Sequence, residues 1–300
     1  MKNDHPVLPY LLLILAACLW SGNIITGRAM HDDIPPLTLT FLRWTLSFII
    51  LLPLCLGKFR EDLPVIRRHW KWLLLISASG IAIFHSFVYT GLSQTTAINA
   101  GLMMASSPII IPIIAYLIHR DGPSTMQSLG IVASLIGVGI IITRGDPAVL
   151  GNLTFNPGDL WILAAMPVWG FYTVLLKGRP KELSSRAMML TITGMGSLIL
   201  LPFYVWEFSK LGGIAFSTPN VVSIAYVSMV ASVIAYFAWN KGVAELGAIK
   251  SGQFLQVIPV CTVLLAMAFL GETLQPFHFA GIALIVGGIV LSSRKSRTTS

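Results

Sequence analysis

The sequence predicts an all-α integral membrane protein with ten transmembrane helices. Of its 300 residues, 55% are hydrophobic and 11% are charged, and the mean hydropathy is +0.79. Soluble domains carry about 25% charged residues. Ten apolar runs have the length of roughly 20 residues that a helix needs to cross a bilayer, and the second half of the chain repeats the first. Too few residues remain outside these runs for a soluble domain.

Each apolar run is read as a helix, because in lipid a helix satisfies its own backbone hydrogen bonds. The predicted helices 1 to 10 are 7–28, 36–57, 72–91, 95–118, 125–143, 159–177, 186–206, 219–241, 246–270 and 275–293. Helix breakers separate them in order: Pro35-Pro36 after helix 1, Pro64 after helix 2, Gly122-Pro123 after helix 4, Pro147 and Pro157 after helix 5, Pro180 after helix 6 and Pro219 after helix 7.

Basic residues are distributed unevenly between the two sets of connections. If the N-terminus lies inside, fifteen Lys and Arg residues fall in inward segments, and only Arg28, Arg144 and Lys210 fall in outward loops. Because Lys and Arg collect on the cytoplasmic side, both termini are predicted to be cytoplasmic. The net charge of +8 is therefore a topology signal, and no nucleic-acid partner is expected.

An internal repeat divides the chain into two five-helix units. An offset of 151 aligns 91–144 with 242–295, including Gly101 with Gly252, and an offset of 149 aligns Trp20 with Trp169. Five is an odd number, so the second unit enters the membrane from the opposite face, as in alternating-access transporters that bind substrate where the repeats meet. The predicted division is 7–144 for the first repeat, 145–158 for a linker, 159–295 for the second repeat and 296–300 for a cytoplasmic tail.

Several short motifs stand at characteristic places in these helices. They are Trp20-Ser21-Gly22-Asn23, Phe41-Leu42-Arg43-Trp44, Ala-x-x-x-Gly followed by Pro at the start of helices 4 and 9, and Leu270-Gly271-Glu272. Together they resemble the drug/metabolite transporter superfamily, EamA type, over nearly the whole chain. The resemblance implies the ten-helix inverted-repeat fold and, in most members, export of amino acids and related metabolites across the bacterial inner membrane. Arg120-Asp121 stands where the first repeat is expected to close with Gly-Glu.

Repeat-equivalent positions face the same axis, which selects candidate substrate-binding residues. His85 aligns with Tyr236, Tyr89 with Asn240, and Trp20 and Asn23 with Trp169 and Tyr172, so four helices offer matched polar and aromatic faces. Such faces suit a cavity for an amphipathic solute. The full set is Trp20, Asn23, His85, Tyr89, Asn99, Met103, Trp169, Tyr172, Tyr236, Asn240, Gln253 and Gln256. The competing interpretation is that the aromatic residues pack and the amides join neighbouring helices.

Three ionisable residues inside helices have two interpretations each. Arg43 lies about 10 Å into helix 2, where it is either a ligand for a substrate carboxylate or a side chain that reaches Asp32, Asp33 or helix-end carbonyls at the outer surface. Lys250 is expected to extend to the cytoplasmic surface. His85 could relay a proton or could only accept and donate hydrogen bonds.

The missing residue types narrow the function. All twelve acids lie at or near helix ends or in loops, so a carboxylate-coupled carrier of cationic drugs is disfavoured. Arg43 and Lys250 are too few cations for a sugar-phosphate carrier. No clustered acids or His-x-x-x-His pair supports the other class considered, a membrane enzyme that modifies lipids. We therefore expect a transporter of small neutral or zwitterionic metabolites, with no cofactor and no metal site, and keep a proton-coupled antiporter as the alternative.

Proline and glycine residues suggest where helices bend or approach closely. Pro108 and Pro259 either gate the cavity or form static kinks. Glycines in helices 5 and 10 suit close backbone approach, either between the two repeats or between two protomers. The sequence therefore leaves the oligomeric state open.

Overall fold

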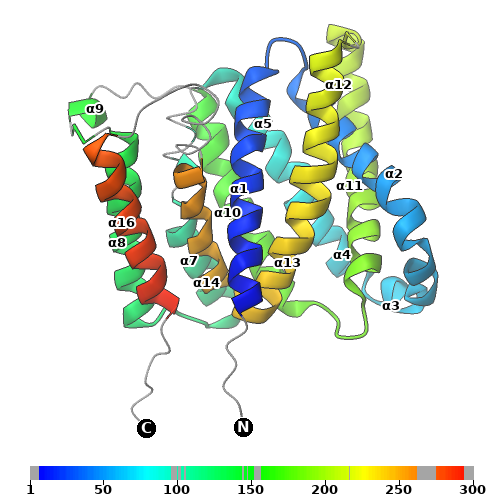
Figure 1. The fold of residues 1–300 in the computed structure, drawn as a ribbon. Coiled ribbons are helices and arrows are strands. Elements are labelled where there is room, and N and C mark those ends of the chain that lie inside the picture. Colours follow the sequence, from blue (N-terminus) through cyan, green and yellow to red (C-terminus); the bar gives the residue numbers. More distant parts are fainter. Residues whose placement is uncertain are drawn as a thin grey trace.

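The computed structural model shows a bundle of helices (Figure 1). It describes residues 7–95, 100, 103, 104, 106–143, 145, 146, 148–151, 157–215, 217–261 and 275–293. The start of the first helix and the end of the last helix lie at the same end of the bundle, which we call the termini face (Figure 1).

The first repeat contains α1 (Val7–Ala29), α2 (Pro36–Glu61), α3 (Leu63–Arg68), α4 (Trp70–Ser77), the π-helix η1 (Ala78–Ile83), α5 (Phe84–Gln94), α7 (Ser107–His119) and α8 (Thr125–Ile142). After α9 (Ala148–Gly151), the second repeat contains α10 (Pro157–Leu175), the 3-10 turn η2 (Leu176–Gly178), α11 (Ser185–Leu211), α12 (Thr218–Ala225), the π-helix η3 (Tyr226–Ile234), α13 (Ala235–Leu246), α14 (Ala248–Gln253), the 3-10 turn η4 (Phe254–Gln256) and α16 (Pro276–Ser293).

The prediction of an all-helical membrane protein is confirmed. Within the described residues, six helices are long and apolar enough to cross a membrane: Val7–Ala29, Pro36–Glu61, Trp70–Gln94, Pro157–Gly178, Ser185–Leu211 and Thr218–Leu246. They correspond to predicted helices 1, 2, 3, 6, 7 and 8. Shorter apolar helices at 107–119, 125–141 and 276–292 correspond to helices 4, 5 and 10, and α14 with η4 lies in helix 9.

Helices 3 and 8 both widen into π-helices at repeat-equivalent places. With the offset of 151, the end of η1 at Ile83 falls on the end of η3 at Ile234. A π-helical turn disturbs the regular backbone ladder and is common at functional sites. Here the repeat-equivalent carbonyls of Gly80 and Ala231 accept side-chain hydrogen bonds, from the Tyr236 hydroxyl at 2.6 Å and from the Trp20 indole at 2.9 Å. The widened turns therefore provide acceptors in the middle of the bundle.

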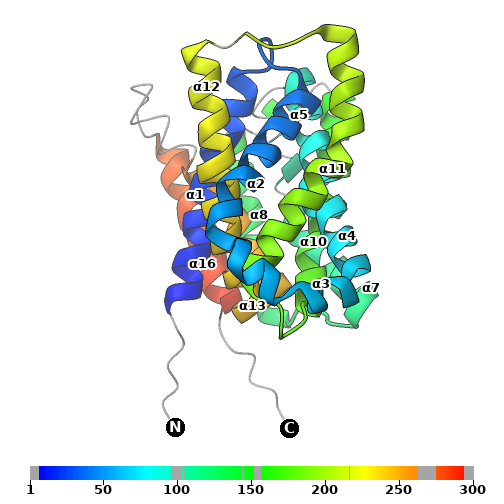
Figure 2. The same ribbon diagram turned by 90° about the vertical axis from the view of Figure 1, so that its right-hand side faces the viewer.

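Helices α2 and α11 lie side by side, and each begins at an acid supplied by the other (Figure 2). Near the end of α11, Glu207 accepts hydrogen bonds from the backbone N–H groups of Leu37 at 3.2 Å and Thr38 at 2.6 Å. Directly after α2, Asp62 accepts one from the N–H of Ser184, the N-cap of α11, at 2.8 Å. Because the first N–H groups of a helix have no partner within the helix, these carboxylates stabilise both helix starts.

The glycine-rich helices α8 and α16 pack against each other along most of their length, at one side of the bundle (Figure 1). A Cβ atom placed on Gly130 would lie 2.4 Å from the carbonyl oxygen of Gly288, and one on Gly137 would lie 2.6 Å from that of Gly281. Gly281 and Gly288 are the repeat equivalents of Gly130 and Gly137. The glycines of helices 5 and 10 therefore join the two repeats of one chain.

Some boundaries differ from the prediction. Helices 2, 7 and 8 extend by about four or five residues beyond the apolar runs, so that Lys58, Glu207 and Glu245 lie inside helices. The loop after helix 2 contains the short helix α3, which the apolar runs did not indicate because it carries Arg67 and Arg68.

Candidate functional site

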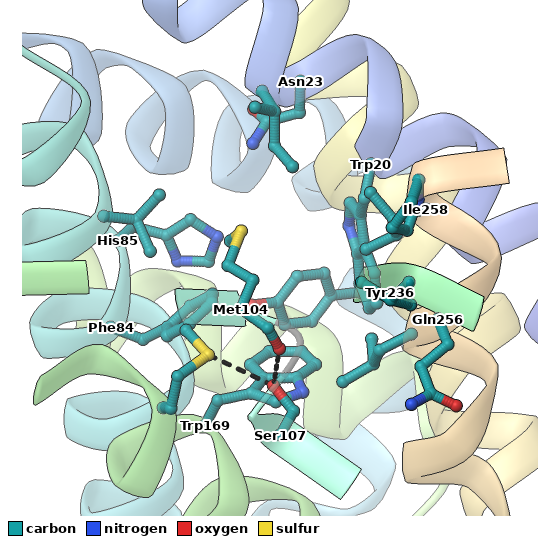
Figure 3. Close-up of a pocket in the computed structure, with 16 residues that line it drawn as sticks. Trp20, Asn23, Phe84, His85, Met104, Ser107, Trp169, Tyr236, Gln256 and Ile258 are labelled. Carbon is teal, nitrogen blue, oxygen red and sulfur yellow. Dashed lines mark hydrogen bonds between the residues drawn. The ribbon is translucent and has the colours of Figure 1, made fainter. Parts of the chain in front are cut away.

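A cavity lies between the two repeats, in the middle of the bundle (Figure 3). Its volume is about 70 Å³, enough for about two water molecules at roughly 30 Å³ each. Its lining residues are Trp20, Asn23, Ile24, Phe84, His85, Val88, Met104, Ser107, Val138, Met166, Trp169, Tyr236, Leu255, Gln256, Ile258 and Pro259. Pockets for drug-sized ligands measure about 300 to 1,000 Å³, so in this conformation the cavity is too small for a ligand of that size.

Repeat-equivalent aromatic residues meet across this cavity. The ring centroids of Trp20 and Trp169 lie 5.2 Å apart with an edge-to-face angle of 90°, and those of His85 and Tyr236 lie 6.1 Å apart. Two equivalent side chains can touch only where they lie beside the axis that relates the repeats. Matched alignment positions therefore locate the centre of the molecule.

Two repeat-equivalent hydrogen bonds flank the cavity, with the residue types exchanged. In the first repeat the Tyr89 hydroxyl of α5 donates to Asn23 Oδ1 of α1 at 2.6 Å. In the second repeat the Tyr172 hydroxyl of α10 donates to Asn240 Oδ1 of α13, also at 2.6 Å. All four side chains are buried. Each bond ties the first helix of a repeat to its third.

Arg43 is fully buried and is held by neutral groups. Its Nη1 donates to Asn23 Oδ1 at 2.9 Å and to the Tyr89 hydroxyl at 2.8 Å, its Nε donates to Ser232 Oγ at 2.5 Å, and its Nη2 donates to the Ala231 carbonyl at 3.1 Å. The guanidinium carbon also lies 5.0 Å from the ring centroid of Trp44.

This arrangement excludes the interpretation in which Arg43 reaches the outer surface, because its side chain is 0% exposed. Its bonds include a π-helix carbonyl, and among the described residues no acid forms an ion pair with it. The repeat-equivalent positions of Arg43 and Ser232 are Ile192 and Ile81, so the positive charge has no counterpart in the other repeat.

Unpartnered polar atoms occur at the cavity wall. Gln256 is 1% exposed, and both atoms of its amide lack a hydrogen-bond partner among the described residues. The indole N–H of Trp169 also lacks one. A buried polar group without a hydrogen bond costs about 1 to 3 kcal/mol of stability. A bound solute with donors and acceptors could form hydrogen bonds with these atoms and remove that cost.

The structure brings six of the predicted substrate-binding residues to the cavity wall: Trp20, Asn23, His85, Trp169, Tyr236 and Gln256. Tyr89, Tyr172 and Asn240 lie behind them in the two hydrogen bonds described above. Gln253 is buried on α14, where its Nε2 lies 3.5 Å from the Gln127 carbonyl oxygen, and Met103 packs in a second apolar cluster. Asn99 lies outside the described residues. Pro108 is the second residue of α7, and Pro259 lines the cavity after η4.

Sequence reasoning missed several wall residues. Phe84 stacks on Trp169 with ring centroids 4.7 Å apart, and the Ser107 hydroxyl bonds the Met104 carbonyl at 2.7 Å and Met166 Sδ at 3.1 Å (Figure 3). Val88 lies three residues after His85 and four after Phe84, spacings that place residues on one helical face, so that face could have been extended from the sequence. Ser107 could not have been found in this way, because α7 has no row of polar residues at helical spacing that would mark one face.

A second, larger cavity of about 940 Å³ lies at the termini face; we call it the vestibule. It is bounded by the ends of α7, α10 and α13 and by the starts of α8 and α14. The helices α7, α8, α10 and α13 each line both cavities and have buried residues at the heights between them. These residues are Ile111 on α7, Ile131 and Ser134 on α8, Tyr172 on α10, and Trp239 and Asn240 on α13. The Tyr172–Asn240 hydrogen bond thus lies in the layer that separates the central cavity from the vestibule.

Comparison with known proteins finds one transporter family whose model matches the chain twice. The model of the EamA-like transporter family matches residues 7–143 and again 156–294. The chain belongs to this family. An EamA-like chain is a membrane transporter and not an enzyme, which confirms the family and the class of function predicted from the sequence.

Relatives of this EamA-like transporter support the family and leave the substrate open. An uncharacterized transporter of Bacillus subtilis, YetK, is 27% identical over 96% of this chain and 87% of its own length. The uncharacterized inner membrane transporter YicL of Salmonella typhimurium is 25% identical over 95% of each chain. A probable terminal-alkyne amino-acid exporter of Streptantibioticus cattleyicolor is 24% identical over 95% of this chain and 93% of its own. A crystal structure with TM-score 0.68 and 19% identity, covering 94% of this chain and 95% of that one, shares the fold.

Proposed function

We propose that this EamA-like transporter exports small neutral or zwitterionic amphipathic metabolites, such as amino acids, across the bacterial inner membrane. The observation that carries the proposal is the central cavity, whose walls combine the rings of Trp20, Trp169 and Tyr236 with the amide of Gln256, which has no hydrogen-bond partner among the described residues. Aromatic walls suit an apolar side chain, and amides suit a carboxylate or an ammonium group. A relative described as a probable amino-acid exporter supports the choice of substrate.

Alternating access between two inverted five-helix repeats is the proposed mechanism. The Asn23–Tyr89 bond and the Tyr172–Asn240 bond then serve as the two gates, one on each side of the cavity. Both are made in the described conformation, and the cavity of about 70 Å³ between them corresponds to an occluded state. The excess of Lys and Arg on the termini face supports a cytoplasmic location for both termini.

No coupling carboxylate is needed for export down a concentration gradient. The two strongly buried acids of the part of the chain that the structure describes, Asp159 and Glu207, lie near helix ends and accept hydrogen bonds from Thr95 and from the start of α2. Neither is among the lining residues of the cavity. We therefore place gradient-driven facilitation ahead of ion-coupled transport.

The test is flux of radiolabelled neutral amino acids in proteoliposomes of the purified protein, without and with an imposed pH gradient. Gradient-independent flux is expected, and Trp169→Ala should lower it at least tenfold at unchanged protein abundance. Trp206→Ala is the matched control, because this tryptophan is 60% exposed on α11, away from the cavity. Wild-type flux in Trp169→Ala would contradict the proposal that substrate binds in the central cavity.

A proton-coupled antiporter is the second candidate, because His85 lines the cavity and is buried. Its Nδ1 lies 3.3 Å from the Ile81 carbonyl oxygen. If His85 carries the proton, flux requires a pH gradient in the native protein and becomes independent of that gradient in His85→Gln. If His85 only binds substrate, the substitution lowers flux equally with and without the gradient.

A further inference from the structure

The vestibule has an unbalanced set of charges. Among the residues that line it, five are cations and one is an acid: Arg120, Lys177, Arg179, Lys181, Lys250 and Asp121. Asp121 is paired with Lys177, and this ion pair lowers the pKa of its carboxyl group. Of the other acids on this face, Glu245 pairs with Lys241 at 2.6 Å and does not line the vestibule. Four positive charges are thus left without a lining acid.

The usual excess of Lys and Arg on the cytoplasmic side explains basic loops. It does not explain two further features of the vestibule. Lys250 is on α14, inside the predicted helix 9, and lines the vestibule wall. Arg120 adopts the left-handed conformation with φ 60°, and it is the only non-glycine residue with a positive φ among the described residues. That conformation costs an L-residue roughly 1 to 2 kcal/mol, and it is one that glycine adopts freely. Arg120 therefore places its guanidinium group at the edge of the vestibule in a strained backbone conformation.

A further positive charge lies on the far side of the central cavity from the vestibule. Arg43 is buried there among neutral acceptors, and its partner Asn23 lines the cavity. Both strongly buried acids of the described chain lie at helix ends, and neither lines the vestibule or the cavity. A cleft lined by one sign of charge raises the local concentration of solutes of opposite charge and speeds their arrival.

We propose that the vestibule is an anion-collecting entrance, and that the transporter selects amphipathic solutes by their carboxylate group. Amino acids are then the zwitterionic members of a wider class that includes N-acylated amino acids and other organic acids with an apolar part. An ammonium group is not required, and amines or amides that lack the carboxylate are rejected. The substrate class rests on the proposed transport function, whereas the potential of the vestibule does not.

The potential can be measured without a known substrate. Ala244 is exposed and lines the vestibule, so Ala244→Cys provides a single thiol once Cys18, Cys55 and Cys261 are replaced by Ser. The thiolate is reacted with an anionic sulfonatoethyl and a cationic trimethylammonioethyl methanethiosulfonate, each of which forms a disulfide and releases methanesulfinate. The ratio of the two rates reports the sign of the local potential.

Neutralising the lining cations with Arg120→Gln and Lys250→Gln should lower the anionic-to-cationic rate ratio about tenfold. The matched control is Arg67→Gln with Arg68→Gln on α3, which removes two charges from the same face outside the vestibule and should leave the ratio unchanged. All four side chains are at or near the surface, and elution as a single species in detergent verifies folding. Equal ratios in both pairs of variants would overturn the entrance proposal.

The substrate class is tested by flux of phenylalanine, N-acetylphenylalanine and phenylalaninamide in proteoliposomes. We expect the two carboxylates to be carried, the amide to be excluded, and Arg120→Gln with Lys250→Gln to raise the KM for N-acetylphenylalanine about tenfold. Transport of the amide at the rate of phenylalanine would overturn carboxylate selection while leaving the proposed transport intact. Absence of flux for all three would count against the proposed function, and the thiol ratio would still decide the nature of the vestibule.

Discussion

Tyr172 donates a hydrogen bond of 2.6 Å to Asn240, and the repeat equivalents of these residues, Asn23 and Tyr89, form the same bond with donor and acceptor exchanged. The geometry is conserved between the repeats while the residue types change places. The two bonds differ in one respect, because Asn23 Oδ1 accepts a second hydrogen bond, from Arg43, whereas Asn240 Oδ1 accepts only the one from Tyr172 among the described residues. This difference leads to the first prediction.

Removing the two tyrosine hydroxyls should have unequal effects. In Tyr172→Phe the buried Asn240 oxygen loses its donor, so the protein should be destabilised by about 1 to 3 kcal/mol. In Tyr89→Phe the Asn23 oxygen keeps Arg43 as donor, and Arg43 Nη1, which loses the Tyr89 hydroxyl, keeps Asn23 Oδ1 as acceptor, so that neither atom is left without a partner and the cost should be about 0.5 to 1.5 kcal/mol. Thermal unfolding of the purified protein in detergent compares the two. A larger loss for Tyr89→Phe would contradict the role given to Arg43.

Arg43 is expected to tolerate neither loss nor replacement by lysine. In Arg43→Ala three polar side chains and the Ala231 carbonyl each lose one of their partners, which should cost at least about 1.5 to 3 kcal/mol, the contribution of a hydrogen bond to a charged group. Arg43→Lys keeps the charge but cannot reach four acceptors with one ammonium, so it should recover only part of this loss. Melting temperature and flux are measured together. Native stability in Arg43→Lys would mean that charge alone matters at this position.

Two glycines of α8, two residues apart, should respond to alanine with opposite signs. A Cβ on Gly137 would lie 2.6 Å from a backbone oxygen of α16, so Gly137→Ala should destabilise the protein by about 1 to 3 kcal/mol. A Cβ on Gly139 would have nothing within 4 Å, so Gly139→Ala should be neutral or stabilise by up to about 1 kcal/mol. Both variants are scored by thermal unfolding, and equal melting temperatures would disprove the close packing of α8 and α16.

Asp62 should make stability depend on pH at the acid end. Hydrogen bonds from Ser184 hold the pKa of the Asp62 carboxyl below its ordinary value of about 4. A lowered folded-state pKa means that the carboxylate stabilises the protein above the ordinary pKa and stops doing so as the pH falls through the folded-state pKa.

The measurable consequence is a pH-dependent effect of Asp62→Asn. At pH 7 this variant should be less stable than the native protein and melt at a lower temperature. The expected loss in free energy of unfolding is that of a helix cap, about 0.5 to 2 kcal/mol. The difference should shrink as the pH falls below about 4. Glu182→Gln, an exposed substitution on the same face, is the control and should show no difference at either pH. If the difference in melting temperature between Asp62→Asn and the native protein is the same at pH 7 and at acid pH, the capping role is contradicted.

Much of the fold was predictable because its signals are local. Apolar length alone places the spans, and repeat offsets alone pair Trp20 with Trp169 and His85 with Tyr236, which the structure brings together. The faces of helices 1, 3, 6 and 8 follow from helical spacing. The end of α11 could not be predicted as well. Glu207 lies inside this helix, and its hydrogen bond to the start of α2 is a tertiary contact that the local sequence does not reveal.

The sequence by itself determined that this chain is a helical membrane protein of two repeats with an aromatic centre, since composition, length and periodicity act along the chain. Only the tertiary structure decided what Arg43 does, because its acceptors come from α1, α5 and η3, and a π-helical turn presents one of them. The vestibule likewise gathers Arg120 and Lys250, 130 positions apart, onto one wall. Such contacts depend on how helices cross and where their backbones widen, which no local pattern encodes.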